Sequence, residues 1–335
     1  MPSSFPSCLR LLALRPASQA SAYQVTAEKM AAAFGRSTSP LPLYEFRLIA
    51  PDDPEMEAAL ARADVLIGSS VPTRVVAATR GALGLIQLTS AGVDHLLPLD
   101  WLPAGVELTS ASGVHGPKVM EWAMMTLLML HGHLPRYATA QRRHEWSPRE
   151  SSTIAGRRLL VFGTGGIGKA VADAGRVLGL VVTGVNRGGA VAPGFQRVVP
   201  TLLAAEALGE ADFVVLAMPL TPETRGMMDR DAFARMKPGA GFANFGRGPL
   251  VDQEALAAAL ESGHLGGAVI DVATPEPLPA SSPLWAVPGL IITPHVSCDD
   301  PETYIDRTLD ILVGNLHRRA AGLPLMNRID RQRAY

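Results

Sequence analysis

Cysteine is scarce in this chain, and charge is both sparse and nearly balanced in sign. The 335 residues include only two cysteines, Cys8 and Cys298, which are too few for a disulfide framework and show no Cys-x-x-Cys metal spacing. Charged residues make up 18% of the chain, and the net charge is −1. Such a balance gives no electrostatic footprint for nucleic acid or an anionic membrane. We therefore expect a protein that holds no metal and binds neither nucleic acid nor membrane.

Long apolar runs are also missing. The N-terminal segment contains only the short run Leu11–Leu14, whereas a secretory signal needs an apolar core of about 7–15 residues. No stretch of about 18 uninterrupted apolar residues occurs, so the sequence predicts no membrane span. A cytoplasmic location, where thiols stay reduced, is the expectation.

Hydrophobic residues, by contrast, are plentiful at 47% of the chain. Together with the length, they are enough to bury the cores of two domains of ordinary size. In the first part of the chain, segments typical of strands alternate with segments typical of helices, which indicates an α/β layer on a parallel sheet. Predicted strands lie at 9–14, 43–49, 65–67 and 84–89, and predicted helices at 26–34, 54–63 and 71–81.

A second alternation begins at residue 158. It predicts strands at 158–163, 180–185, 212–217, 240–245, 267–272 and 290–293, with helices that include 166–178, 229–236, 252–262 and 301–321. Between the two alternations, residues 117–134 form another long predicted helix, which is apolar on nearly all sides and is expected to be buried between domains. Residues 136–151 are polar and are expected to be irregular.

A glycine turn lies at the start of the second alternation. The pattern Gly163-x-Gly165-x-x-Gly168 follows the apolar run Leu159–Phe162 and leads into the small-residue segment Ala170–Gly175. Gly163 permits the tight turn, Gly165 lets a diphosphate approach the backbone, and Gly168 lets the helix pack closely on the strand. The N–H groups at the helix N-terminus favour an anion. The segment therefore predicts a dinucleotide site.

The residues at the end of the next predicted strand bear on which dinucleotide binds. Sites that prefer NAD place an acidic residue there, about 20 residues on, to accept a hydrogen bond from the ribose 2′-hydroxyl. Here the position holds Asn186, followed by Arg187. Asn186 does not repel a 2′-phosphate and Arg187 could pair with one, so we predict a preference for NADP(H) over NAD(H). The alternative, that Arg187 stacks on the adenine, stays open.

Three polar motifs follow later strands, at 244–252 (NFGRGPLVD), 271–279 (DVATPEPLP) and 293–295 (TPH). In an open α/β sheet, ligands bind outside the carboxyl ends of the strands. Arg247, Glu276 and His295 are therefore expected to converge beside the glycine turn, although they are far apart in the sequence.

The order and spacing of these motifs resemble the D-isomer-specific 2-hydroxyacid dehydrogenase family, which includes glyoxylate/hydroxypyruvate reductases. The likeness runs from about residue 62 to 327, is dense between 154 and 296, and includes Pro219–Thr224, Met236–Gly239 and Pro283–Trp285. It implies an α/β fold with two doubly wound domains. A Rossmann dinucleotide-binding domain is expected at 113–295, and a flavodoxin-like, discontinuous substrate domain at 1–112 and 296–335, with the active site between them.

The resemblance also implies catalytic roles. Arg247 would hold the carboxylate and carbonyl of a 2-oxo acid, because a planar guanidinium suits that geometry. His295 would protonate the carbonyl oxygen as hydride reaches C2, and would act as the base in oxidation. Glu276 would bond the other imidazole nitrogen and keep the proton available near neutrality.

Further contacts follow from the resemblance. Asp271 is similar to the residue that bonds the nicotinamide carboxamide, and main-chain N–H groups of the loop at Ser90 would bind the substrate carboxylate. Predicted cofactor contacts are Gly163, Gly165, Gly166, Ile167, Gly168, Asn186, Arg187, Pro219, Thr224, Phe245, Gly246, Arg247, Asp271 and His295. Predicted substrate contacts are Val71, Ser90, Ala91, Gly92, Arg247 and His295.

The favoured function is an NAD(P)-dependent oxidoreductase that acts on the CH–OH group of 2-hydroxy acids and reduces small 2-oxo acids such as glyoxylate or hydroxypyruvate. One alternative is a dinucleotide-sensing corepressor of the same fold. Another is a phosphite or phosphoglycerate dehydrogenase, although phosphoglycerate dehydrogenases usually carry a regulatory extension. Glu276 argues against a formate dehydrogenase, which carries Gln there. The resemblance also implies a homodimer that packs through the cofactor domain and the 117–134 helix, which is apolar enough for such a contact.

Overall fold

The computed structural model describes residues 6–15 and 23–331 and divides the chain into two compact units. Unit 1 comprises Met1–Val114 and Asp300–Tyr335, and unit 2 comprises His115–Asp299. The sequence predicts the domain boundaries at 112/113 and 295/296. The assignment of substrate binding to one domain and cofactor binding to the other stays a prediction. The expectation of no secretory signal concerns an N-terminal segment of which residues 1–5 and 16–20 lie outside the described residues.

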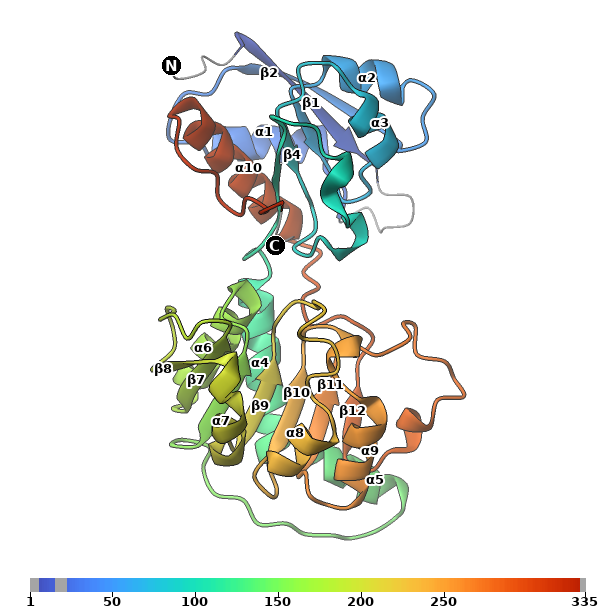
Figure 1. The fold of residues 1–335 in the computed structure, drawn as a ribbon, viewed down its shortest axis with the longest axis vertical. Coiled ribbons are helices and arrows are strands. Elements are labelled where there is room, and N and C mark those ends of the chain that lie inside the picture. The colour runs from blue at the N-terminus through green and yellow to red at the C-terminus, as the bar shows by residue number, and fades with distance from the viewer. Residues whose placement is uncertain (1–5, 16–22, 332–335) are drawn as a thin grey trace. The chain divides into compact units, whose positions relative to one another are not determined.

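Unit 1 is built on a five-stranded parallel sheet with the order β2-β1-β3-β4-β5 (Figure 1). Its strands are β1 Cys8–Leu14, β2 Leu43–Ile49, β3 Val65–Ile67, β4 Leu85–Gln87 and β5 Glu107–Thr109. Its helices are α1 Ala27–Gly35, α2 Met56–Arg62, α3 Thr73–Ala78 and α10 Tyr304–Ala320. This strand order is the flavodoxin-like, doubly wound arrangement that the family resemblance implies.

Both faces of the unit 1 sheet are covered, which explains the continuous apolar run Leu11–Leu14 in the interior strand β1. In β1, Leu12 and Leu14 pack into a core with α2 and α3, whereas Leu11 and Ala13 pack on the other side with α1 and α10. Side chains alternate between the two faces of a strand, so a strand buried on both faces needs a continuous apolar run.

Unit 2 contains a seven-stranded parallel sheet with the order β12-β11-β10-β9-β6-β7-β8 (Figure 1). Its strands are β6 Arg158–Phe162, β7 Val181–Asn186, β8 Arg197–Pro200, β9 Phe213–Leu216, β10 Gly241–Asn244, β11 Gly267–Ile270 and β12 Leu290–Ile292. Its helices are α4 Gly116–His131, α5 Leu134–Arg142, α6 Gly166–Val177, α7 Ala204–Glu210, α8 Arg230–Arg235 and α9 Gln253–Glu261. The strand order reverses between β6 and β9, because β7 and β8 follow on one side of β6 and β9 to β12 on the other, which makes this the topological switch point of a Rossmann sheet.

The two faces of the unit 2 sheet have separate cores. Leu159 and Val161 of β6 pack with α4 and α6, whereas Leu160 and Phe162 pack with α7, α8 and α9. Every residue of the inner strands β9, β10 and β11 is buried. The prediction of two doubly wound α/β domains is therefore confirmed.

The prediction that the 117–134 helix is buried on all sides is wrong. The helix is not buried all round, because Val119, Ala123 and Leu127 are buried whereas Met125 and Leu128 are 43% and 49% exposed. One face of α4 packs on α6 and the sheet. The sequence did not indicate this one-sided packing, because the exposed face of α4 also carries apolar residues.

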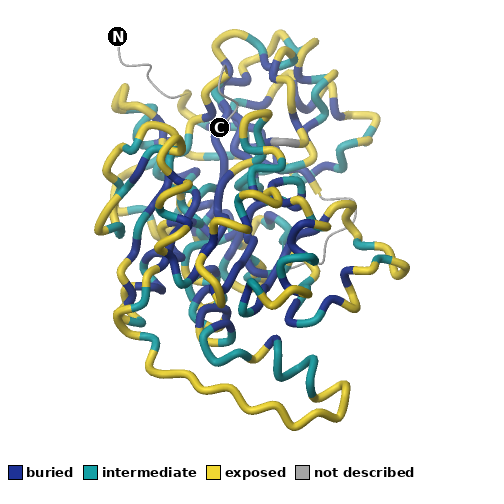
Figure 2. The backbone as a smooth tube through the Cα atoms, turned by 60° about the horizontal axis from the view of Figure 1, so that its bottom comes forward, coloured by how far each residue is buried: buried dark blue, intermediate teal, exposed yellow. Residues whose placement is uncertain are grey.

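The segment 136–151 is not irregular throughout, since α5 occupies Leu134–Arg142. Proline at the first turn is compatible with a helix start. The Arg136 guanidinium then fixes α5 to the rest of unit 2 by donating to the carbonyl oxygens of Leu260, Leu265 and Gly266 at 2.7–3.0 Å. These tertiary contacts stabilise a helix that the local sequence favours only weakly. Residues 143–153 are exposed and without helix or strand (Figure 2).

Candidate functional site

The glycine turn joins β6 to α6 at the switch point of the unit 2 sheet. Gly163 has a φ of +97°, and a Cβ there would lie 2.5 Å from the Ala217 carbonyl oxygen. A Cβ on Gly168 would lie 1.9 Å from the Gly163 carbonyl oxygen, so the helix packs on the strand only because this residue is glycine. A Cβ on Gly165, by contrast, would meet nothing within 4 Å. The turn thus combines tight packing with open space at the N-terminus of α6, which fits a dinucleotide diphosphate.

No carboxylate stands at the end of β7. The Asn186 amide donates to the Thr164 hydroxyl at 3.2 Å and to the Ala190 carbonyl at 2.8 Å, and its oxygen accepts from the Ala190 N–H at 3.1 Å. Asn186 therefore ties the loop after β7 to the glycine turn. Sequence reasoning missed Thr164, whose only signal was its place inside the glycine pattern.

The exposed Arg187 lies near the loop that contains Pro219 and Thr224. Its charge helps to lower the pKa of Glu223, although the hydrogen bond from the Thr221 side chain is the larger cause. The Thr224 hydroxyl donates to the Pro219 carbonyl at 2.9 Å and accepts from the Thr221 N–H at 2.7 Å, which fixes this loop. The charge of Arg187 thus acts on the loop that contains two other predicted cofactor contacts.

Glu276 and His295 form a hydrogen-bonded pair beyond the carboxyl ends of β11 and β12. His295 Nδ1 lies 3.1 Å from Glu276 Oε2, and Glu276 Oε1 accepts from the Ala273 N–H at 2.9 Å. One carboxylate oxygen is thus held by the backbone and the other by the imidazole. Nε2 makes no hydrogen bond to other residues that the structure describes, and the His295 side chain is 48% exposed.

Arg247 follows β10 in a turn that Asn244 fixes. The Asn244 amide donates to the Arg247 carbonyl at 3.0 Å and accepts from the Gly246 N–H at 3.0 Å. The half-buried Arg247 guanidinium donates to the Gly246 carbonyl at 2.8 Å. Its charge also reaches Cys298, whose pKa burial raises to about 11 and Arg247 slightly lowers. The Arg247 side chain therefore lies close to the segment that carries His295.

The predicted substrate residues Val71, Ser90, Ala91 and Gly92 all lie in unit 1. The Ser90 hydroxyl donates to the Gly92 carbonyl at 3.0 Å, and the Ser90 carbonyl accepts from the Ala111 N–H at 3.0 Å. The Tyr304 hydroxyl donates to the Thr89 carbonyl, so the start of α10 also holds this loop. Their substrate contacts stay predictions.

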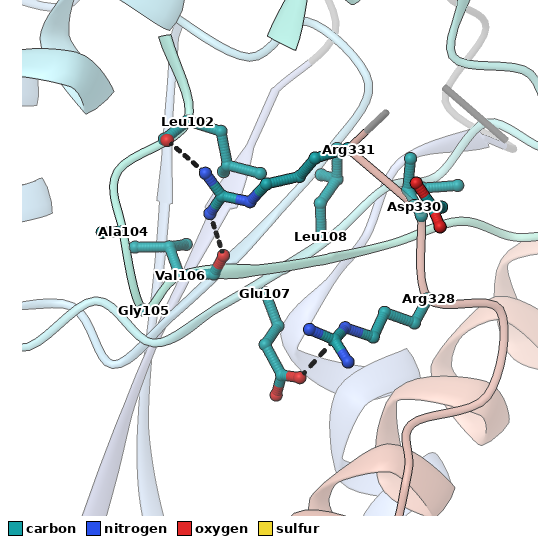
Figure 3. Close-up of a pocket in the computed structure, with 10 residues that line it drawn as sticks. Leu102, Ala104, Gly105, Val106, Glu107, Leu108, Arg328, Asp330 and Arg331 are labelled. Atoms are coloured by element: carbon teal, nitrogen blue, oxygen red, sulfur yellow. Dashed lines mark hydrogen bonds and ion pairs between the residues drawn. The ribbon is translucent and has the colours of Figure 1, made fainter. Parts of the chain in front are cut away.

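Two cavities contain none of the predicted site residues. One, of about 790 Å³, lies in unit 1 between β5 and the segment after α10 (Figure 3). There Arg331 donates to the carbonyls of Leu102 and Val106 at 2.8 and 3.0 Å. The other, of about 470 Å³, lies in unit 2 where β6, β9 and β10 begin, and its lining includes Arg157 and Lys237. Because the strands are parallel, it is at the opposite end of the sheet from the glycine turn.

The described residues contain no group of three or more His, Cys, Asp or Glu side chains that could hold a metal ion. Within the same part of the chain, no helix is long and apolar enough to cross a membrane.

Fold and site together define a dinucleotide-binding α/β protein, and comparisons with known proteins narrow this class. The family model described as "D-isomer specific 2-hydroxyacid dehydrogenase, NAD binding domain" matches residues 124–297. A glyoxylate reductase/hydroxypyruvate reductase of Mus musculus is 33% identical over 259 residues, which cover 74% of this chain and 77% of the relative. The chain therefore belongs to the D-isomer specific 2-hydroxyacid dehydrogenase family, whose members are oxidoreductases acting on CH–OH groups.

Two solved structures are similar over almost the whole chain. The D-isomer specific 2-hydroxyacid dehydrogenase of Xanthobacter autotrophicus Py2, in complex with NADPH and MES, has a TM-score of 0.81 and 30% identity, covering 97% of this chain and 99% of its own. An NADPH-dependent glyoxylate/hydroxypyruvate reductase of Sinorhizobium meliloti, in complex with NADP and sulfate, has a TM-score of 0.77 and 26% identity, covering 98% and 100%.

Relatives named D-3-phosphoglycerate dehydrogenase are longer than this chain. Those of Mycobacterium bovis and Mycobacterium tuberculosis are 31% identical over 256 residues, which cover 75% of this chain but 48% of the relative. The chain thus spans about half the length of these curated relatives.

Proposed function

We propose that this chain is a D-2-hydroxyacid dehydrogenase that reduces small 2-oxo acids, of the size of glyoxylate or hydroxypyruvate, with a preference for NADPH. The observation that carries the proposal is the hydrogen bond of 3.1 Å between His295 Nδ1 and Glu276 Oε2, beyond the strand ends of a Rossmann sheet. The names of the mouse and Sinorhizobium meliloti relatives support the choice of substrate.

Each site residue has a separate role in the reduction. Arg247 pairs with the substrate carboxylate, because a guanidinium can donate two parallel hydrogen bonds to it. A bound nicotinamide cofactor supplies the hydride that reaches C2. His295 Nε2 gives its proton to the carbonyl oxygen, which leaves a neutral imidazole and a hydroxyl group. Glu276 holds Nδ1–H and stabilises the imidazolium form before transfer.

A panel of acids and cofactors tests the proposal. Glyoxylate, hydroxypyruvate, pyruvate and phosphohydroxypyruvate are each offered with NADPH and with NADH, and phosphite is offered with both oxidised cofactors. We expect the highest kcat/KM for glyoxylate or hydroxypyruvate with NADPH. A dinucleotide sensor would bind the cofactor and turn over none of the acids. Oxidation of phosphite, or a clear preference for phosphohydroxypyruvate, would instead favour the other dehydrogenase branches.

Arg187 carries the proposed cofactor preference. In Arg187→Gln we expect kcat/KM with NADPH to fall by about tenfold, because a hydrogen bond to a charged group contributes about 1.5–3 kcal/mol. The value with NADH should change little. Arg197→Gln is the matched control. Arg197 is also an exposed arginine, but it lies at the start of β8, whereas Arg187 follows the end of the neighbouring parallel strand β7. A wild-type enzyme with the higher kcat/KM for NADH would contradict the preference.

We also propose a homodimer. The exposed apolar side chains Met125 and Leu128 on α4, together with Val177 on α6, offer a surface that a second copy would cover. Light scattering should give twice the chain mass of 35.4 kDa. Leu128→Glu should shift the protein toward the monomer, and a monomeric wild-type protein would overturn the proposal.

A further inference from the structure

Asp271 is a buried acidic residue, 1% exposed, directly after β11. Its Oδ1 accepts from the Thr293 hydroxyl at 2.6 Å and from the Val296 N–H at 2.9 Å. Its Oδ2 accepts from the Ser297 N–H at 2.9 Å. The main-chain oxygen of Asp271 accepts from the His295 N–H at 2.8 Å. All four donors belong to the segment 293–297, which carries the proposed proton donor.

This segment needs such an anchor because His295 is in a strained conformation. Its φ is +57°, in the left-handed region that non-glycine residues seldom adopt. Strained residues of this kind persist only where the surrounding structure over-determines them. Packing does not do this, since the His295 side chain is about half exposed. The hydrogen bonds to Asp271 on both sides of His295 supply the constraint.

We infer that Asp271 is a positioning residue, which holds the segment 293–297 so that the His295 imidazole stays aligned with Glu276. This inference rests on the proposed function, in which His295 gives the proton. Asp271 acts through the loop and not on the reacting atoms. An ionised carboxylate offers about four acceptor sites, of which the loop occupies three. The site that is left is compatible with the predicted contact between Asp271 and the carboxamide of the cofactor.

The Thr293 hydroxyl gives a test that leaves Asp271 itself unchanged. Thr293→Val keeps the shape of the side chain and removes the donor, whereas Thr293→Ser keeps the donor. In Thr293→Val we expect kcat to fall by about tenfold, because a hydrogen bond to a charged group is lost. The Kd for NADPH should stay within about twofold, and Thr293→Ser should recover most of kcat.

An NMR measurement that does not depend on enzyme activity accompanies the kinetics. With ¹⁵N-labelled histidine, the Nδ1 proton that His295 shares with Glu276 should give an NMR signal in the wild-type protein and in Thr293→Ser. The signal should be broadened or moved in Thr293→Val. If Thr293→Val keeps both the wild-type kcat and the His295 signal, the inference is wrong. It is also wrong if both variants lose kcat in proportion to their thermal stability.

The failure of this inference can be told apart from a failure of the proposed function. If the wild-type protein turns over no 2-oxo acid, the proposed function fails, while the NMR comparison of the two Thr293 variants still decides whether Asp271 positions His295. If the wild-type protein is active and the Thr293 variants behave alike, only the positioning role fails.

Discussion

Replacement of His295 is expected to lower kcat by about 10³-fold and to leave the Kd for NADPH unchanged. Proton transfer by a positioned side chain contributes about 10²–10⁴-fold to rate, and no other group in the proposed mechanism donates a proton to the carbonyl oxygen. The half-exposed His295 side chain fills no core, so its removal should not unfold the protein.

The choice of substituent matters because of the backbone at this position. Alanine is strained at a φ of +57°, whereas asparagine tolerates the left-handed region and cannot serve as a general acid. We therefore expect His295→Asn and His295→Ala to lose kcat alike, with His295→Asn the more stable. Steady-state kinetics and fluorescence titration of NADPH measure the two quantities. His264→Gln is a control, because His264 bonds the Phe233 carbonyl and lies outside the site. Near-normal turnover by His295→Asn would exclude His295 as the proton donor.

The second large effect is expected at Gly168. In Gly168→Ala the new Cβ would lie 1.9 Å from the Gly163 carbonyl oxygen and 2.8 Å from its carbon, so α6 must move away from β6. Both contacts are to backbone, which cannot change rotamer to make room. We expect the free energy of unfolding to fall by about 1–3 kcal/mol, which is the usual cost of overpacking a core. The affinity for NADPH should fall by at least about 100-fold. Denaturant unfolding and fluorescence titration measure both.

Gly165→Ala separates the two roles of the glycine turn. A Cβ at Gly165 meets no other atom within 4 Å, so this variant should unfold at the same denaturant concentration as the wild type. Its methyl group would nevertheless occupy the space that a diphosphate needs, so NADPH binding should weaken. If Gly168→Ala binds NADPH with wild-type affinity, or if Gly165→Ala binds it unchanged, residues 163–168 do not form the cofactor site.

The regular part of the fold could be read from the sequence because it depends on local patterns. The apolar runs that became β1 and β6 are long enough to stand out, and both are buried on two faces. The short strand β5 begins with Glu107 and β8 begins with Arg197, so neither shows an apolar run. The helix α5 depends on the Arg136 hydrogen bonds to distant carbonyls, which no local pattern reveals.

The candidate site, too, could be predicted from the sequence only in part. The motifs placed Arg247, Glu276 and His295 at strand ends, and the hydrogen bond between His295 and Glu276 is present, while the catalytic roles stay predictions. The left-handed backbone of His295 and the bonds from Asp271 to Thr293 and Ser297 could not be predicted. The hydrogen bonds join residues that are distant in the sequence. Both features depend on the path of the chain after the neighbouring strands β11 and β12.

The central claim is that this chain moves hydride to C2 of a 2-oxo acid and makes the D-hydroxy acid. The most direct measurement is the fate of deuterium from NADPH labelled on one or the other face of C4, with hydroxypyruvate as the substrate. We predict D-glycerate with deuterium on C2 from one of the two labelled cofactors and none from the other. The L-isomer, product without deuterium from either cofactor, or no product would contradict the claim.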